Sequence, residues 1–479
     1  MKCDSYSCKG ESHIVSGKPC QDSSDHYSDE KTGVYIAIVC DGHGGDRYFR
    51  SDQGSRFLCH ITKDTLVKFA EIISKRNRKS ESPLFIGKPF TQVPTLSESN
   101  DELPRQSEED KAIIQMFSSI VTQWRIEISK HADTFPITDW ESKNVRPEYL
   151  SDFQNRKQLE KVYGSTVMAC LITKDYWLAF HLGDGKCIMF DDSDKYIQPV
   201  LWDEKCFLNR TTSICDPAPT DELRYTYQGD GIFPVAIFLG SDGIDDSYGD
   251  GDGLHNFYLT ILRGLLKEGP NAIHDSLVES LPIISKRGSQ DDMSVAFIYN
   301  EKIFREHVLN LTRAQITEFE GQLLEKEKEI KVQKSTIDEM AGQYERERSC
   351  LSIGDTSSRE YKACEKLRIN LKYAQADYQT LVANRDALVK QIKSLYEYLG
   401  ESSKNYAFEE PPKNFFQWIG SLISGEYGKR CDAEKTAEYR PYFSEEKAIQ
   451  ELDEAERQLK VLMSNSEANR IKKDGIDNE

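Results

Sequence analysis

The stretch VYIAIVCDGHGG, residues 34 to 45, joins an apolar run to an aspartate and a glycine-rich turn. A short apolar run bounded by Gly and Asp is typical of a buried strand. Asp41 stands at the C-terminal end of this run, and the glycines after it let the backbone come close to a ligand. The stretch therefore predicts a strand that ends in a binding loop.

Other runs of the same kind indicate at least four more strands: STVMACLIT (165 to 173), YWLAFHL (176 to 182), VAIFLG (235 to 240) and MSVAFIY (293 to 299). A turn near Lys174 and Asp175 would pair the first two of these runs as a hairpin. That pairing brings Thr166 and Asp184 to the same edge of a sheet. Apolar positions from Ile113 to Ile128 recur at helical spacing and predict a helix that packs on a sheet.

Acidic residues flank these strands in positions that place them on one rim. Asp242 follows its strand, whereas Asp291 and Asp292 precede theirs, as an antiparallel neighbour requires. Several carboxylates cannot share a rim without a counter-charge, because like charges repel and raise one another's pKa. Few Lys or Arg residues flank the motifs, and ligands that are all oxygen atoms suit Mg²⁺ or Mn²⁺. The pattern favours a divalent metal site.

Five motifs in order, VCDGHGG, YGSTV, HLGDG, LGSDGIDD and GSQDDMSVAFI, resemble the metal-dependent (PPM-type, type 2C) serine/threonine protein phosphatases. The start, which matches SHxxxGxPCQD, is similar to the bacterial-type variant, and the resemblance spans about residues 1 to 300. It implies an α+β fold, a four-layer α-β-β-α sandwich of two antiparallel sheets. It also implies hydrolysis of phosphoserine and phosphothreonine on proteins, by a water molecule activated between two divalent ions.

The resemblance also implies which residues hold two Mg²⁺ or Mn²⁺ ions: Asp22, Asp41, the Gly42 carbonyl, Asp242 and Asp291. Asp41 would bridge both ions and Asp22 would reach metal through water. Asp184 would help to hold a third, weaker ion. His43 matches the proposed general acid, whose alternative role is that of a turn histidine.

The chain departs from the family pattern at Gln21, where Glu is frequent, and at Gly185, where Ser is usual. The arginine that commonly binds substrate phosphate is missing, which leaves Lys18 as the candidate for that role or as an ordinary surface lysine. These departures support an alternative function, a catalytically inactive phosphatase-like binding module on a coiled-coil scaffold.

The composition changes near residue 305, where glycine becomes rare and apolar residues follow a heptad spacing. We expect a phosphatase domain over residues 1–303, with a flexible insertion at 79–110. An antiparallel coiled-coil hairpin would follow over 304–400. An aromatic linker, a helix and a disordered tail would then fill 401–479. The helices cover one another or serve in partner binding, oligomerisation or targeting, since periodicity does not reveal the facing helix.

Length, charge and cysteine usage limit the remaining classes. The 479 residues carry a formal charge of -18, which disfavours nucleic acid and anionic membranes as partners. No signal peptide or membrane span is evident, so we expect a cytoplasmic signalling enzyme. The 12 cysteines lack a C-x-x-C motif and are expected to be reduced core residues rather than zinc ligands. Expected partners are a phosphorylated protein, a cognate Ser/Thr kinase and a second chain held through the C-terminal helices.

Overall fold

The computed structural model describes residues 1–95, 107–206, 210–248, 251–351 and 358–406. It divides into two compact units, one of Met1–Leu323 with Lys390–Ser403 and one of Leu324–Val389 with Lys404–Glu479. The expected aromatic linker, last helix and tail after residue 406 lie outside the described residues. None of the helices in the described ranges has the length and apolar character needed to cross a membrane.

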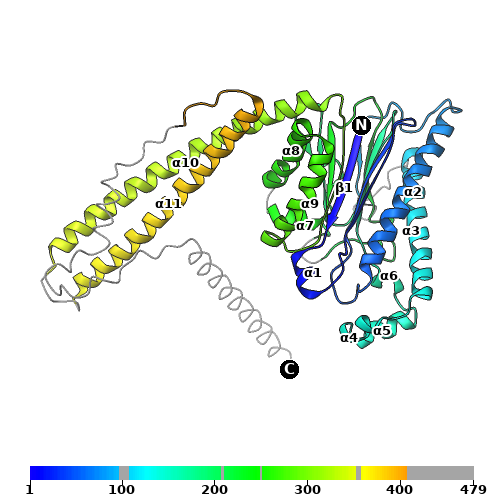
Figure 1. The fold of residues 1–479 in the computed structure, drawn as a ribbon, viewed down its shortest axis with the longest axis horizontal. Helices are drawn as coiled ribbons and strands as arrows, with labels where there is room; N and C mark the ends of the chain where they lie inside the picture. The colour runs from blue at the N-terminus through cyan, green and yellow to red at the C-terminus, as the bar shows by residue number, and fades with distance from the viewer. Residues whose placement is uncertain (96–106, 207–209, 249–250, 352–357, 407–479) are drawn as a thin grey trace, which may run out of the picture. The chain divides into compact units, whose positions relative to one another are not determined.

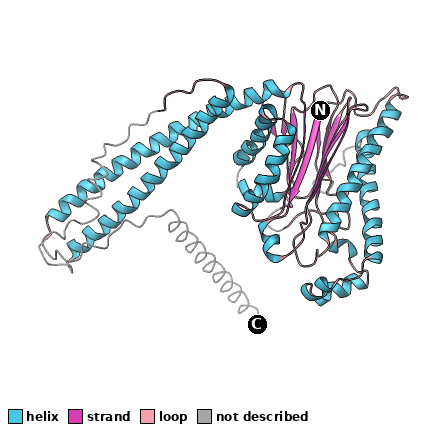
Figure 2. Ribbon diagram, in the orientation of Figure 1, coloured by secondary structure: helices cyan, strands magenta, loops and turns pink. Residues whose placement is uncertain are grey.

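The first unit contains two antiparallel sheets (Figure 2). One sheet has the order β1 (Lys2–Cys8), β11 (Met293–Tyr299), β10 (Ala236–Gly240), β7 (Lys186–Phe190) and β8 (Tyr196–Ile197). The other has the order β2 (Ser23–Asp29), β3 (Val34–Cys40), β5 (Val167–Ile172), β6 (Trp177–Leu182), β9 (Arg224–Gln228) and β4 (Thr91–Val93). The five predicted strands are all present, within two residues of the expected bounds.

Helices cover the outer face of each sheet (Figure 1). The sheet with β3 is covered by α2 (Ser51–Asn77) and α3 (Glu108–Thr134), and the sheet with β11 by α7 (Asp242–Tyr248), α8 (Gly251–Lys267) and α9 (Pro270–Arg287). The remaining short helices are α1 (Glu11–Ser16), α4 (Asp139–Asn144), α5 (Pro147–Gln154) and α6 (Leu159–Val162). Three apolar layers result, and the middle layer between the sheets includes Val39, Leu239 and Ala296. The expected sandwich of helices on two sheets is confirmed.

Two expectations about boundaries can be compared with the structure. Residues 79–110, the expected flexible insertion, contain the strand β4 and the first residues of α3, while 96–106 lie outside the described residues, and the flexibility stays a prediction. The first unit extends past residue 303 because Phe304, Val308 and Leu311, at the start of α10 (Phe304–Ser349), pack into the core under α8.

The second unit is built on α10 and α11 (Arg359–Leu399). Within it Ile330 and Ile337 pack against Tyr378, and Tyr344 packs against Cys364. Higher numbers on α10 therefore meet lower numbers on α11, so the helices run antiparallel (Figure 1). A supercoil of the coiled-coil type remains a prediction.

Candidate metal centre

The strand pairing brings the predicted acidic residues to one end of the two sheets. Ser23 pairs with Cys40, which places Asp22 beside Asp41. In the other sheet Gly240 pairs with Val295, so the loop after β10, with Asp242, lies beside the loop before β11, with Asp291. Asp184 follows β6, whose partner β5 starts beside the Asp41 loop. The structure thus brings together the carboxylates that the sequence placed on one rim, which we call the acidic rim: Asp22, Asp41, Asp184, Asp242 and Asp291.

The electrostatics of the acidic rim show how close these groups lie. Burial, followed by the charges of neighbouring aspartates, holds the pKa of Asp22 and of Asp41 well above the ordinary range. Burial and the carboxylates of Asp184 and Asp291 raise the pKa of Asp242 to about 7, although a hydrogen bond with Asp41 acts in the opposite direction. Repulsion of this kind is what a bound cation removes.

The protein does not balance the charge of the acidic rim, and the arrangement suits a divalent cation. Within the described residues, no lysine or arginine forms an ion pair with Asp22, Asp41, Asp184, Asp242 or Asp291. The Oδ2 atom of Asp22 is buried and has no hydrogen-bond partner there. A buried carboxylate oxygen without a partner costs free energy, so a positive ion or its hydration water is the group that this oxygen suits.

The loop after β3 is fixed by backbone contacts that require Gly42. Thr166 N–H donates to the Asp41 carbonyl at 2.8 Å, and Gly42 forms an isolated bridge with Ser165. A Cβ atom on residue 42 would lie 2.4 Å from the Gln21 carbonyl oxygen and 2.9 Å from that of Ser51. The glycine therefore allows the segments that carry Asp22 and Asp41 to pack in direct contact.

Gln21 and Gly185, where the sequence departs from the family pattern, both have a structural explanation. The Gln21 side-chain amide donates to the His43 carbonyl at 3.1 Å and to Ser51 Oγ at 2.5 Å, and an ionised glutamate has no proton to donate. At residue 185 a Cβ atom would lie 2.6 Å from the Gly240 carbonyl oxygen and 2.6 Å from the Met168 side chain. A serine at this position would require its neighbours to move.

His43 is held beside the acidic rim by a hydroxyl group and an aromatic ring. Its Nε2 atom lies 2.7 Å from Ser213 Oγ, and its ring meets the Tyr48 ring edge-on. Burial lowers the pKa of His43 to about 4, so the ring is neutral near pH 7. This environment disfavours a protonated His43, and its predicted role as general acid stays a prediction.

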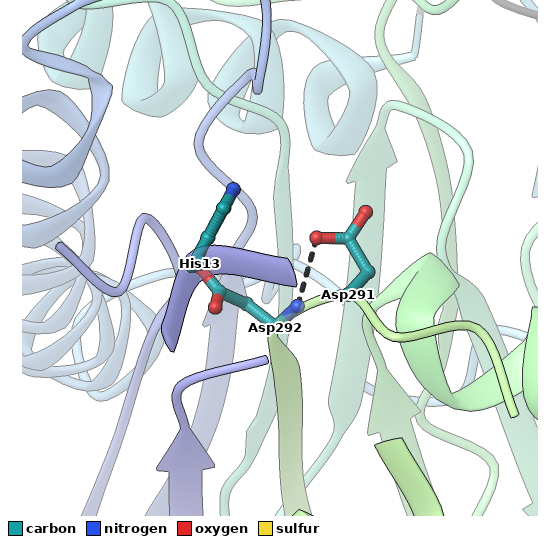
Figure 3. Close-up of side chains that lie close together, drawn as sticks. All are labelled: His13, Asp291 and Asp292. Atoms are coloured by element: carbon teal, nitrogen blue, oxygen red, sulfur yellow. Dashed lines mark hydrogen bonds and ion pairs between the residues drawn. The ribbon is translucent and has the colours of Figure 1, made fainter. Parts of the chain in front are cut away.

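The segment before β11 combines an aspartate on the rim with one that is fully engaged by the protein. Ligand atoms of His13, Asp291 and Asp292 lie within 4.8 Å of one another (Figure 3). Asp292, however, accepts hydrogen bonds from Gly10 N–H at 2.6 Å, from Gln21 N–H at 2.6 Å and from His13 Nδ1 at 2.9 Å. Burial opposes its charge, but these donors hold the pKa of Asp292 below its ordinary value. Asp291 remains the better metal ligand of the two.

The two less certain site residues lie at the edges of the centre. Burial, followed by the charge of Asp246, raises the pKa of Asp184, while a hydrogen bond with Thr211 opposes the rise. Lys18 is half-exposed and its Nζ atom donates to the Gly44 carbonyl at 3.1 Å. Lys18 therefore sits against the DGHGG loop, where an anion bound at the rim could be reached. Sequence reasoning missed Asp246 and the partners of Asp292, because both depend on contacts between distant segments.

Comparison with known proteins agrees with this geometry. The chain matches the protein phosphatase 2C family over residues 9–281, and it belongs to that family. The class of enzyme that the fold and the site define is a serine/threonine protein phosphatase. Among curated protein sequences, none matches the chain.

Solved structures similar to the chain include bacterial phosphatases. Stp1 from Staphylococcus aureus is 14% identical, with a TM-score of 0.34, over 63% of this chain and 95% of that one. PstP/Ppp from Mycobacterium tuberculosis is 13% identical, with a TM-score of 0.34, over 62% of this chain and 97% of that one. A PstP catalytic domain, 14% identical with a TM-score of 0.34 over 62% of this chain and 96% of that one, is in complex with two manganese ions.

Proposed function

We propose that the chain hydrolyses phosphoserine and phosphothreonine on proteins, with two divalent ions, Mg²⁺ or Mn²⁺, held by the acidic rim. The observation that carries the proposal is a convergence of carboxylates in which burial and neighbouring charges raise the pKa of Asp22, Asp41 and Asp242 and which form no ion pair with a lysine or arginine among the described residues. The ligands would be Asp22, Asp41, the Gly42 carbonyl, Asp242 and Asp291, and Asp184 would serve a third, weaker ion.

When bound, two such ions neutralise the charge of a phosphoryl group and make a water molecule easier to deprotonate. The protein's own part is to fix the carboxylates. Thr166 and Gly42 hold the Asp41 loop, and Gln21 ties this loop to the segment with Asp22. His43, neutral at pH 7 and in contact with Ser213, would orient the substrate or the loop, and Lys18 would contact the substrate phosphate.

The alternative of an inactive binding module loses part of its support. Gln21 donates two hydrogen bonds within the site, and Gly185 is required by close packing. Only the missing arginine still favours that alternative. The same activity measurements decide between the two functions.

The test is manganese-dependent hydrolysis of a phosphothreonine peptide by the full chain, compared with Asp41→Asn and Asp242→Asn. Asp175→Asn is a matched control, because Asp175 is exposed in the turn at the opposite end of the β5–β6 hairpin. We expect activity in the wild type and the control, and its loss in both rim variants. A folded wild-type chain that binds no Mn²⁺ and cleaves no phosphopeptide would favour the inactive module.

The helices α10 and α11 are proposed to serve partner binding, self-association or targeting. In the second unit, Val332, Ile369 and Tyr373 are apolar yet exposed, while Ile330, Ile337 and Tyr378 fill the seam between the two helices. Mass measurement by light scattering of the full chain tests self-association, because a dimer would have twice the mass of 54.9 kDa.

A further inference from the structure

We infer that Asp292 and His13 form a positioning pair that aligns Asp22 and Asp291 for metal binding. The inference rests on the proposed function, since it concerns the same metal centre. In this role the two residues position metal ligands and do not themselves bind an ion. The pair consists of His13 Nδ1 and Asp292 Oδ2 at 2.9 Å, and both side chains are buried.

Asp292 gathers three donors from one distant segment. Its Oδ1 atom accepts from Gly10 N–H at 2.6 Å, and its Oδ2 atom accepts from Gln21 N–H at 2.6 Å as well as from His13. The donors come from both ends of residues 10–21, so a single carboxylate closes this segment into a loop. Charge-assisted hydrogen bonds of this kind are short and strong.

The loop leads directly to the metal ligands on both sides. Gln21, whose N–H is held, precedes Asp22, and Asp292 follows Asp291 in the chain. A shift of the Asp292 carboxylate would therefore move the backbone at Asp22 and at Asp291 together. Asp291 is held further, because its Oδ1 atom accepts from Asp292 N–H at 2.8 Å (Figure 3).

Backbone contacts also hold the start of the segment of residues 10–21 against the segment that carries Asp291. A Cβ atom on Gly10 would lie 2.2 Å from the Asp291 carbonyl carbon. Ser12 N–H donates to the Gln290 carbonyl at 2.9 Å, and Ser285 Oγ links Glu11 N–H to the Asp291 carbonyl. These contacts bring the segments together, and the His13–Asp292 pair fixes where Asp22 lies relative to Asp291.

The pair is also distinct from a metal site of its own. Every oxygen of Asp292 is already used by a protein donor, and the Nδ1 atom of His13 is used by Asp292. An ion bound there would have to displace backbone N–H groups that would then be buried without partners, which is costly. The geometry thus favours alignment over direct coordination.

The experiment measures the Mn²⁺ dissociation constant of the full chain by electron paramagnetic resonance, for the wild type and for Asp292→Asn, His13→Ala and His13→Asn. Asp292→Asn leaves at least one N–H donor facing another donor, so we expect Mn²⁺ affinity to fall about 10-fold, as for other groups that orient metal ligands. His13→Ala should also weaken binding, whereas His13→Asn, which keeps a donor near the position of Nδ1, should restore it.

Asp194→Asn is the matched control. Asp194 lies in the same unit, its carboxylate accepts from the His307 ring at 2.7 Å, and it is outside the metal centre. It should change thermal stability without changing Mn²⁺ affinity. Asp292→Asn combined with His13→Ala should weaken Mn²⁺ binding no more than Asp292→Asn alone, because the two groups act as a unit.

The inference is overturned if Asp292→Asn and His13→Ala lower the melting temperature but leave the Mn²⁺ dissociation constant within two-fold of the wild type. If Asp292→Asn does not fold, His13→Ala decides alone, since it leaves both backbone hydrogen bonds to Asp292 intact. Phosphopeptide hydrolysis by the wild type is measured separately. A chain that binds Mn²⁺ but cleaves nothing contradicts the proposed function, while the alignment of ligands is still judged from Mn²⁺ affinity.

Discussion

The acidic rim and the Arg50–Glu141 pair bury charge in the same compact unit, yet they do so in opposite ways. Glu141 receives Arg50 Nε at 2.6 Å and Arg50 Nη2 at 2.9 Å, and it also caps α4 through Thr138. Asp41 and Asp242 instead face other carboxylates. A buried charge normally has its partner beside it. The difference is what the proposed metal site requires, because a cation from outside the chain would balance the charge that Arg50 balances for Glu141.

The largest effect is expected from Asp242→Asn, which removes one carboxylate of the acidic rim. We expect phosphopeptide hydrolysis to fall by at least about 10³-fold, roughly 4 kcal/mol, because a ligand and its charge are lost. The metal-free variant should nevertheless melt at a higher temperature than the metal-free wild type, since one repelling charge is gone. Calorimetry with and without chelator measures this, and a lower melting temperature without metal would contradict the comparison.

Glu141→Gln should have the opposite effect on stability. Removal of one partner from a buried ion pair leaves the other charge unpaired, so we expect the free energy of unfolding to fall by about 3 kcal/mol. Denaturant titration measures the change. Glu148→Gln is the control, because Glu148 is exposed in the first turn of α5. Equal effects of the two substitutions would show that the Arg50 contact is unimportant.

The pH dependence of stability in the metal-free protein also tests whether the charge of the acidic rim is unbalanced. The pKa of Asp242 is about 7 in the folded chain against an ordinary 3.8, so the folded state holds a proton that the unfolded state has lost between these values. The stabilising contribution of this group is present below about pH 4 and is lost as pH rises toward 7. One proton corresponds to a slope of up to about 1.4 kcal/mol per pH unit. Unfolding of the wild type and Asp242→Asn in chelator at several pH values tests this, and identical slopes would disprove it.

The smallest effect is expected from an exposed pair. Lys2 and Glu30 lie 3.0 Å apart with both side chains largely in water. Lys2→Ala should change the free energy of unfolding by less than about 0.5 kcal/mol, because solvent screens the interaction. The same denaturant titration measures it. A change as large as that from Glu141→Gln would mean that burial does not separate the two kinds of charge.

The five strands that the sequence predicted are short apolar runs, and β3 and β11 consist almost wholly of apolar residues. β9 was missed although it is fully buried, because its sequence RYTYQ is polar. β1 and β2 were missed because KCDSYSC and SSDHYSD are polar and half-exposed. Both are edge strands, which have a neighbour on one side only and need less apolar surface.

The aspartates of the candidate site could be predicted from sequence for a similar reason. Asp41 and Asp242 each follow an apolar strand, so strand order fixes where they lie. The contact between His13 and Asp292 spans 279 residues and has no local pattern that marks it. The surroundings of His43 could not be predicted from the sequence either, since its low pKa depends on burial beside Ser213 and Tyr48.

The pairing of β1 with β11 joins the first described strand of the first unit to its last, with Cys8 opposite Met293. The proposed ligand Asp291 precedes β11, so a nascent chain has no complete set of the proposed ligands until residues past 291 leave the ribosome. Contacts between segments this distant also form slowly in folding. Capture of manganese would therefore report that the whole phosphatase unit has been made and assembled, and a chain cut short before β11 would be left without its chemistry.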